Sequence, residues 1–274
     1  MDLQLKGKRA LVTGSSSGIG AETARWLAAE GAHVVIHGRR TAAVADLVKD
    51  LQGEGLNAAG VTGDLSSDAG ADAAATAALA AFGGIDILVN NAGQFVVPDK
   101  TEPAQWFGKD TADHGTALFE ANVNSVFRMV QRVVPNMQTR GWGRVIMLGS
   151  VLADLPGDQF PHYGLTKSAN LNQAVNLSRV LAGTGITVNS ISPGVIRTPM
   201  TEPLIWGMAS QFGWGNDWDV IEVQAATHAF AAATPRLGRP EDIARAVAFL
   251  ASPLSDFING ANMRVDGGMN PTVN

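Results

Sequence analysis

Tyr163 and Lys167 are the residues of this chain whose types and spacing most directly suggest chemistry. They lie four residues apart in a segment with helical spacing, so both side chains are expected on one face of a helix. A lysine ammonium near a phenol favours the phenolate and lowers the tyrosine pKa from about 10 towards the working pH. A tyrosine tuned in this way can serve as a general acid or base. An ordinary surface pair explains the same spacing, so the rest of the chain must decide.

Two further polar residues are expected near this pair. Ser150 follows Gly143–Gly149, an apolar run bounded by glycines that is typical of a buried parallel strand. Its hydroxyl can therefore reach the same point in space as the tyrosine. Asn122 lies in an otherwise apolar stretch of a long predicted helix that continues to about Gln138. A buried asparagine needs partners, so it is either a structural amide or the holder of backbone or water for catalysis.

A glycine-rich turn joins the first predicted strand to the first predicted helix. The strand Arg9–Thr13 runs directly into Gly14, and a helix over Ala21–Glu30 follows Gly18 and Gly20. In this context glycines allow the backbone to approach a pyrophosphate at a helix N-terminus. The three glycines alone would be weak support, because flexible turns are rich in glycine. Their position between a strand and a helix indicates a nucleotide-binding turn.

The end of the second predicted strand carries arginines where many dinucleotide sites carry an acid. The strand His33–His37 is followed by Gly38, Arg39 and Arg40. An acidic residue there would bond the ribose 2′-hydroxyl of NAD, whereas a guanidinium suits a 2′-phosphate. Both arginines are also explained as solvated charges. Because the strand end lacks the acidic residue and carries two arginines instead, we favour phosphate recognition by Arg39, assisted by Arg40 or Ser15.

Other strand ends carry small or polar residues suited to the same ligand. Asp64 and Leu65 follow the third predicted strand, Leu56–Thr62, where an adenine can lie. The fourth predicted strand runs into Asn90–Gly93, whose amides can brace neighbouring turns through bonds to the backbone. Taken alone, this tetrapeptide fits any asparagine-rich turn.

Composition limits the classes of protein that this chain can represent. Its 274 residues include 46% apolar and 16% charged residues, which is typical of a globular protein with a sizeable core. The net charge of −5 argues against nucleic acid or an acidic membrane as the main partner. The chain has no cysteine, which excludes disulfides, thiolate nucleophiles and cysteine-ligated zinc. With no signal-like or membrane-spanning apolar run, we expect a soluble, cytoplasmic protein.

Strands and helices alternate along the whole chain, which predicts an α/β fold. We expect one domain over residues 1–274, with a doubly wound, Rossmann-type parallel sheet of about seven strands and helices on both faces. Gly185–Ile191 is predicted as the sixth strand and Ala261–Val265 as the last. A final helix begins at Arg239–Asp242, where a proline and two acids fit a helix N-terminus.

The stretch from Thr198 to Pro235 is predicted to be irregular and to cover the substrate. It holds Trp206, Trp214 and Trp218 among glycines, a composition that suits a mobile flap with an apolar face. For any single ring, an anchor that holds a surface loop on the body is the simpler interpretation. Together they favour a lid over an apolar or bulky carbonyl substrate, with Leu152 and Trp106 as further wall residues.

Nearly the whole chain resembles the short-chain dehydrogenase/reductase family. The nucleotide motif of that family is matched by Thr13, Gly14, Gly18, Ile19 and Gly20, and its Asn-Asn-Ala-Gly by residues 90–93. Its catalytic serine precedes the tyrosine of Tyr-x-x-x-Lys by 13 residues, as Ser150 precedes Tyr163. The similarity is greatest to the branch of 3-oxoacyl-carrier-protein reductases, and it fades over residues 198–235, so the substrate is not carried over.

The resemblance implies a mechanism and assigns the catalytic roles to Asn122, Ser150, Tyr163 and Lys167. Tyr163 would protonate the carbonyl oxygen or deprotonate the alcohol in reverse, while Ser150 stabilises charge on the same oxygen. Lys167 would lower the tyrosine pKa and bond the nicotinamide ribose, and Asn122 would hold a water that passes protons to it. No metal is implied, and the five histidines show no ligand spacing.

The motifs and the resemblance together predict one set of cofactor-binding residues. They are Gly14, Ser15, Ser17, Gly18, Ile19, Gly20, Arg39, Arg40, Asp64, Leu65, Asn91, Ala92, Gly93, Tyr163, Lys167, Pro193, Gly194, Ile196 and Thr198. We therefore expect an oxidoreductase that transfers a hydride between NADP(H) and a ketone or secondary alcohol. The resemblance also implies a homotetramer, formed through the helices at 113–138 and 163–182 and the last strand.

Two alternatives stay open at this stage. One is an NAD(H)-dependent alcohol dehydrogenase that works in the oxidative direction, and residues 38–40 would discriminate it from an NADP(H) enzyme. The other is a nucleotide-binding protein that keeps the fold and lacks the chemistry. The complete set of Asn122, Ser150, Tyr163 and Lys167 argues against that second alternative.

Overall fold

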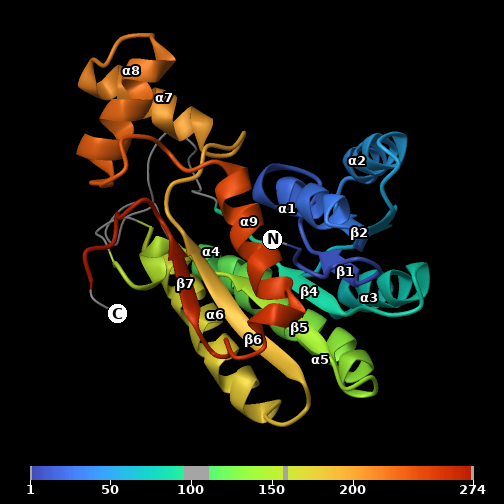
Figure 1. Cartoon of the computed structure of the whole chain (residues 1–274). Helices are drawn as coiled ribbons and strands as arrows, with labels where there is room; N and C mark the ends of the chain where they lie inside the picture. The colour runs from blue at the N-terminus through green and yellow to red at the C-terminus, as the bar shows by residue number, and fades with distance from the viewer. Residues whose placement is uncertain (1, 96–110, 157–159, 273–274) are drawn as a thin grey trace.

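The computed structural model describes residues 2–95, 111–156 and 160–272, and within them it contains a seven-stranded parallel sheet (Figure 1). The strand order is β3-β2-β1-β4-β5-β6-β7. The strands are β1 Arg9–Val12, β2 His33–Gly38, β3 Ala58–Thr62, β4 Ile87–Asn90, β5 Gly143–Leu148, β6 Ile186–Pro193 and β7 Asn262–Val265. This confirms the predicted Rossmann-type fold and the expected strands, whose ends shift by one to three residues; β4 was expected to begin at Gly84.

Helices cover both faces of the sheet. They are α1 Gly18–Ala29, α2 Thr41–Gly53, α3 Asp68–Ala81, α4 Ala112–Phe119, α5 Ser125–Gln138, α6 Pro161–Val180, α7 Glu202–Phe212, α8 Trp218–Gln224 and α9 Pro240–Ala251. Helices α1, α2 and α9 pack on one face and α3, α5 and α6 on the other. No helix in the described part of the chain is both long and apolar enough to span a membrane.

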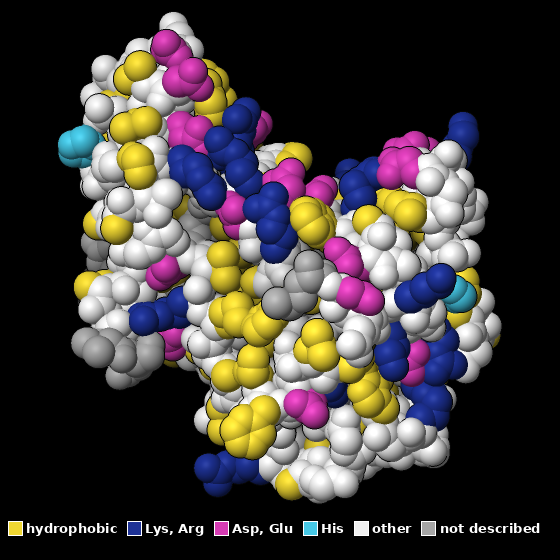
Figure 2. Space-filling model, in the orientation of Figure 1, with side chains coloured by type: hydrophobic (Ala, Val, Ile, Leu, Met, Phe, Trp, Pro, Cys, Tyr) yellow, Lys and Arg dark blue, Asp and Glu magenta, His cyan; other side chains and the backbone are white. Residues whose placement is uncertain are grey.

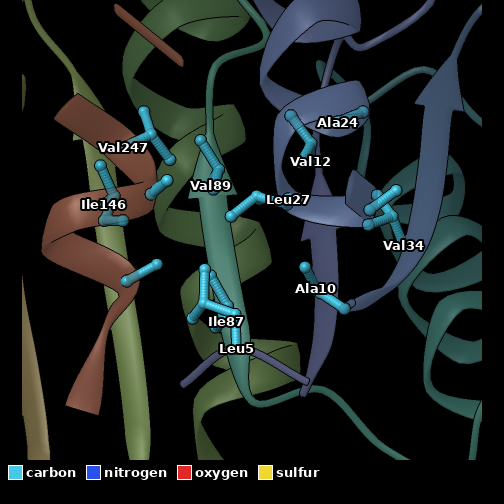
Figure 3. Packing of buried hydrophobic residues seen from close by; sticks show 14 of the residues in the cluster. Leu5, Ala10, Val12, Ala24, Leu27, Val34, Ile87, Val89, Ile146 and Val247 are labelled. Carbon is cyan, nitrogen blue, oxygen red and sulfur yellow. The ribbon is translucent and has the colours of Figure 1, made fainter. Parts of the chain in front are cut away.

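Strand β1 shows how the two sides of the core are divided. Ala10 and Val12 belong to the cluster under α1, α2 and α9, whereas Leu11 between them belongs to the cluster on the opposite face. This alternation follows from the period of two along a strand, and both faces are apolar because both are covered. In Figure 3 the side chains of Leu27 from α1 and Val247 from α9 meet those of Val12, Val89 and Ile146 between the helices and the sheet.

The chain order leaves a crevice at the carboxyl ends of the strands. From β1 the chain moves outwards through β2 and β3, and it then returns to place β4 on the other side of β1. Connections leave β1 and β4 in opposite directions, and ligands bind at such switch points in open α/β sheets. The glycine turn, Asn90–Gly93, Ser150 and Pro193 all follow strands at this edge.

The segment from Thr198 to Pro235 is not irregular, and this prediction was wrong. It contains α7, α8 and a π-helical turn at Ala225–Ala229. These elements share a small core of their own around Ile205, Ile221 and Leu237, and we call the segment 198–235 the lobe. In Figure 1 the lobe projects from the carboxyl edge of the sheet, and Figure 2 shows a hollow between it and the part of the body formed by α1 and α2.

Candidate active site

A cleft of about 770 Å³ lies at the carboxyl edge of the sheet. Its walls come from the glycine turn, from the segments after β2 to β6 and from the lobe. Every predicted cofactor-binding residue except Ser15 lines it, and so do Ser150 and Tyr163. The sequence motifs, which lie far apart along the chain, therefore meet in one cavity.

Ser150 and Tyr163 are joined by a hydrogen bond between their hydroxyl groups. Ser150 follows β5, is almost fully buried, and also accepts a bond of 3.2 Å from the amide of Leu152. Tyr163 lies in the first turn of α6. Burial raises the pKa of Tyr163 to about 12, and the bond to Ser150 opposes this shift. The phenol is therefore protonated at neutral pH, which is the form that can donate a proton.

Lys167 lies one turn further along α6, as its spacing predicts. Its Nζ donates a hydrogen bond of 2.8 Å to the carbonyl oxygen of Leu148 and lies 5.7 Å from the centre of the Tyr163 ring. Burial lowers the pKa of Lys167 to about 8. Burial is the largest influence on the pKa of Tyr163, and the ammonium of Lys167 points to a backbone carbonyl, so a lowering of the tyrosine pKa by this lysine stays a prediction.

Asn122 is fully buried within a π-helical turn, Glu120–Asn124, between α4 and α5. Its side chain accepts a bond of 2.6 Å from the amide of Gln94 and donates to the Gln94 carbonyl at 3.0 Å. It also donates to Thr166 on α6 at 3.1 Å. Asn122 therefore holds the segment after β4 against the helix of Tyr163. Of the two roles left open by the sequence, the structure shows the backbone-holding one, and the water relay stays a prediction.

The glycine turn needs its glycines because the segment after β4 packs closely against it. A Cβ at Gly14, whose φ is +64°, would lie 2.8 Å from Cα of Ala92. A Cβ at Gly20 would lie 2.4 Å from Nδ2 of Asn91. That amide donates to the carbonyls of Thr13 and Gly14, at 2.9 and 3.1 Å. The predicted bracing role of the asparagine motif is thus present in the structure.

Comparison with known proteins agrees with this arrangement. A family model described as enoyl-(acyl carrier protein) reductase matches residues 14–270. The chain is 38% identical to the uncharacterized oxidoreductase YvaG of Bacillus subtilis, over 98% of each protein. It is 35% identical to the 3-oxoacyl-[acyl-carrier-protein] reductase FabG of Vibrio cholerae, over 97% of this chain and 99% of that one.

The chain belongs to the short-chain dehydrogenase/reductase family. Among solved structures, L-sorbose reductase from Gluconobacter frateurii, complexed with NADPH and L-sorbose, superposes with a TM-score of 0.91. The two chains are 31% identical, and each is covered completely. This protein is therefore an oxidoreductase of that family that acts on carbonyl or alcohol substrates with NAD(P)H.

Within this family member, Ser15 is the predicted cofactor residue that the structure does not bring to the cleft. Its hydroxyl is fully buried, donates to the Val12 carbonyl at 2.7 Å and accepts from the His37 amide at 3.0 Å. Ser16 lines the cleft instead. Three consecutive serines cannot be distinguished from the sequence alone, because the one that turns inwards is selected by its bonds to β2.

His37 also lines the cleft, a position that the spacing of the histidines in the sequence did not predict. The amide of Gly14 donates to its Nδ1 at 3.1 Å, and its Nε2 lies 3.2 Å from the Gly63 carbonyl. Burial lowers the pKa of His37, so the neutral ring links the ends of β1, β2 and β3. His37 thus stabilises the backbone at the end of the cleft formed by the residues after β1, β2 and β3.

Arg39 and Arg40 are exposed side chains at that same end of the cleft. Gly38 precedes them, and a Cβ built there would lie 2.9 Å from the Ser16 hydroxyl and 3.1 Å from Cγ2 of Val44. An acidic side chain at position 38 would therefore displace Ser16. Ser16, Arg39 and Arg40 therefore line the end of the cleft that follows β2.

The three tryptophans predicted to contact substrate do not line the cleft. Trp214 and Trp218 pack against the small core of the lobe, and the ring of Trp206 lies tilted against that of Trp218, with centres 5.4 Å apart. Arg197 lies 4.2 Å above the Trp218 ring. These rings hold the lobe together, so the prediction that they cover the substrate was wrong. Leu152 does line the cleft, and Trp106 lies outside the described residues.

The lobe faces the cleft with other side chains, which the sequence analysis did not identify. They are Met200, Leu204, Met208, Ala229 and Phe230. Phe95 and Phe160 line the cleft beside Tyr163. The local sequence does not distinguish these cleft residues from core residues. Their position in the cleft depends on tertiary packing, which for Leu204 and Met208 is the packing of α7.

Proposed function

We propose that this protein is an NADP(H)-dependent ketone reductase. The observation that carries the proposal is the geometry of the cleft, which brings Ser150, Tyr163 and Lys167 together with the glycine turn in one cavity. A phenol that is protonated at neutral pH can donate its proton to the alkoxide that forms when a carbonyl is reduced. The relation to L-sorbose reductase and to FabG supports the same direction.

Each polar group of the site has a distinct part in this reaction. Tyr163 donates its proton to the carbonyl oxygen, and Ser150 donates a hydrogen bond to the same oxygen, which stabilises the charge that develops there. Lys167 holds the end of β5 through the Leu148 carbonyl and keeps a cation within about one turn of the phenol. Asn122 fixes the segment after β4 against α6. When bound, NADPH supplies the hydride to the carbonyl carbon.

The cleft suits a nucleotide cofactor with a 2′-phosphate. The glycine turn allows a phosphate to approach the N-terminus of α1 closely. The side chain of Ser17, the residue before that helix, makes no capping bond to the first amides of α1. Arg39 and Arg40 supply cations where Gly38 leaves no room for an acid. A guanidinium binds a phosphate with paired, charge-assisted bonds, so Arg39 is assigned as the main contact and Ser16 as its neighbour.

Assembly as a homotetramer belongs to the same proposal. Phe127 on α5 and Leu165, Val175 and Val180 on α6 are exposed apolar side chains. Figure 2 shows further hydrophobic side chains over β7 and α9, and Phe257 near them is fully exposed. Apolar surface of this extent is commonly covered by a second subunit, and two such faces on one chain fit a tetramer.

A comparison of Arg39→Ala with the wild type tests the cofactor assignment. We expect kcat/KM for NADPH to fall by about 10-fold to 100-fold, because one charged hydrogen-bonded contact to phosphate is lost. The value for NADH should change less than about twofold, since NADH lacks that phosphate. The measurement is NADPH or NADH consumption with a panel of ketones, together with identification of the product alcohol. A wild type that prefers NADH, or that reduces no ketone with either cofactor, contradicts the proposal.

A further inference from the structure

The substrate end of the cleft is apolar. Among the described cleft residues that follow residue 140 in the chain, Lys167 is the one charged side chain. It is 5% exposed, and its Nζ is bonded to the Leu148 carbonyl. The other charged groups of the described walls, Arg39, Arg40 and Asp64, follow β2 and β3 at the opposite end of the sheet order. A charged substrate group would find no available counter-ion at the end formed by these later residues.

Among the described cleft residues that follow residue 140, the polar side chains are mostly bonded to the protein itself. The hydroxyl of Thr201 donates to the Ile196 carbonyl and lies 3.1 Å from the Thr198 hydroxyl. Ser150 and Tyr163 are reserved for the reacting oxygen. A polyol would bring several hydroxyl groups here, and each one that loses water without a new partner weakens binding.

A row of aromatic rings adjoins the catalytic tyrosine. The centre of the Phe95 ring lies 4.9 Å from that of Tyr163, with the two rings edge to face at 80°. On its other side, Phe95 lies 4.7 Å from Phe160. All three side chains line the cleft. The surface next to the proton donor is therefore made of ring faces and edges, which favour contact with another ring.

Phe160 is held in a strained backbone conformation. Its φ and ψ are +58° and +47°, the left-handed region, directly before Pro161 at the start of α6. Glycine adopts this region freely, whereas a bulky residue there is an outlier. Strain of this kind persists where the surrounding structure requires the residue, and here the ring completes the aromatic row.

The lobe supplies the rest of the apolar wall. Leu204 and Met208 come from α7, and Phe230 follows the π-helical turn. Methionine is unbranched and polarizable, and its sulfur makes favourable contacts with aromatic rings. A flat ring can therefore pack against Phe95 and Phe160 and against the side chains of α7.

We propose that the substrate is an uncharged aryl ketone, and that Phe95 and Phe160 are the residues that determine this specificity. The inference rests on the proposed ketone reduction and narrows it. The aryl ring packs on the aromatic row, its ketone oxygen meets Ser150 and Tyr163, and both charged and polyhydroxylated ketones are disfavoured because the described wall offers them few partners.

A matched set of ketones tests the chemical class. With NADPH, we expect kcat/KM for acetophenone to exceed that for 3-acetylbenzoate by at least about tenfold, since a carboxylate must lose water without a cation to replace it. L-sorbose should be poorer than acetophenone by a similar factor or more. A higher kcat/KM for 3-acetylbenzoate or L-sorbose overturns this inference and leaves ketone reduction intact. Failure of every ketone overturns the proposed function itself.

The Phe160→Gly variant tests the aromatic row, because it removes the ring and also relieves the backbone strain. We expect the relief of backbone strain to offset part of the stability lost with the ring, and the KM for acetophenone to rise by about tenfold, with less than about twofold change for acetone. Phe95→Leu should raise the same KM while keeping an apolar side chain. The control Phe212→Ala, on α7 outside the cleft lining, should leave KM unchanged. An unchanged acetophenone KM in both cleft variants overturns the assignment of Phe95 and Phe160.

Discussion

Burial sets the proton inventory of the catalytic residues. The interior of the cleft disfavours charge on both members of the pair, so the pKa of Tyr163 rises to about 12 and that of Lys167 falls to about 8. Tyr163 is thus protonated at neutral pH and can act as a proton donor. Because Ser150 lies beside the Tyr163 hydroxyl, the proton of Tyr163 and a hydrogen bond from Ser150 can reach the same carbonyl oxygen.

The ionisation of Tyr163 can be followed directly, because it is the only tyrosine in the chain. A tyrosine with the ordinary pKa of 10.0 is half ionised at pH 10, whereas Tyr163, with a pKa of about 12, should stay almost entirely protonated there. A titration of phenolate absorbance in the folded protein measures this. The same titration after unfolding in guanidinium should return the midpoint to about 10. A folded-state midpoint at or below 10 contradicts the burial argument.

At this scale, sequence spacing predicted proximity but not electrostatics. The interval between Tyr163 and Lys167 correctly placed both on one side of α6, and Ser150 was correctly placed beside the phenol. Spacing could not show that the ammonium turns to the Leu148 carbonyl. Ser15 was misplaced for a related reason, because its hydroxyl is fixed by β2, which is distant in sequence.

At the scale of elements, the lobe is a pair of short helices held by charge and aromatic contacts. Glu222 on α8 forms a paired salt bridge with Arg239 at the start of α9 and accepts a bond of 3.1 Å from the Leu237 amide. Trp218 is held between Trp206 and Arg197. Helices of 11 and 7 residues are marginal alone, so these contacts to the body and to each other stabilise them.

Trp218→Ala separates a structural role from a substrate role for the lobe tryptophans. We expect a loss of roughly 2–4 kcal/mol in the free energy of unfolding, because a large ring leaves a partly buried site. The KM for acetophenone should change by less than about twofold, since this ring does not line the cleft. Thermal unfolding and steady-state kinetics provide the two values. A raised KM for bulky ketones with an unchanged Tm would return Trp218 to the substrate site.

The elements that sequence predicted best are those with strong periodic patterns or clear end signals. Strand β5 contains the apolar run Val145–Leu148, and the proline and acids at residues 240–242 mark the start of α9. The helices of the lobe were not predicted because Gly207 lies inside α7 and a π-helical turn interrupts the helical periodicity after α8. Its helices depend on tertiary packing, which no local pattern shows.

The whole molecule divides the cleft between two kinds of recognition. Strands β1 to β3 present glycines, Arg39, Arg40 and Asp64, whereas β5, β6 and the lobe present rings and aliphatic groups. The proposed proton donor and its neighbours Ser150 and Lys167 lie after β5 and on α6. This arrangement suits a charged cofactor at one end and an uncharged substrate at the other. It also explains why the fold and catalytic set were accessible to sequence motifs, while the substrate wall was not.

Light scattering tests the proposed assembly. The wild type should show a mass of four chains of 28.6 kDa each. Val180→Lys places a charge on α6 at a position that is 76% exposed in the single chain, and it should reduce the mass to that of a smaller species. Val220→Lys makes the same change on the lobe, at a position that is 46% exposed, and should leave the mass unchanged. A monomeric wild type contradicts the tetramer.

Turnover by Tyr163→Phe, measured beside NADPH binding, tests the central claim most directly. The substitution removes one hydroxyl and keeps the ring, so the dissociation constant for NADPH should stay within about twofold of the wild type. Reduction of acetophenone, or of whichever panel ketone the wild type reduces best, should slow by about 10²–10⁴-fold, the range expected for loss of a general acid. A variant that binds NADPH normally and reduces the ketone at the wild-type rate would contradict the assignment of Tyr163 as the proton donor.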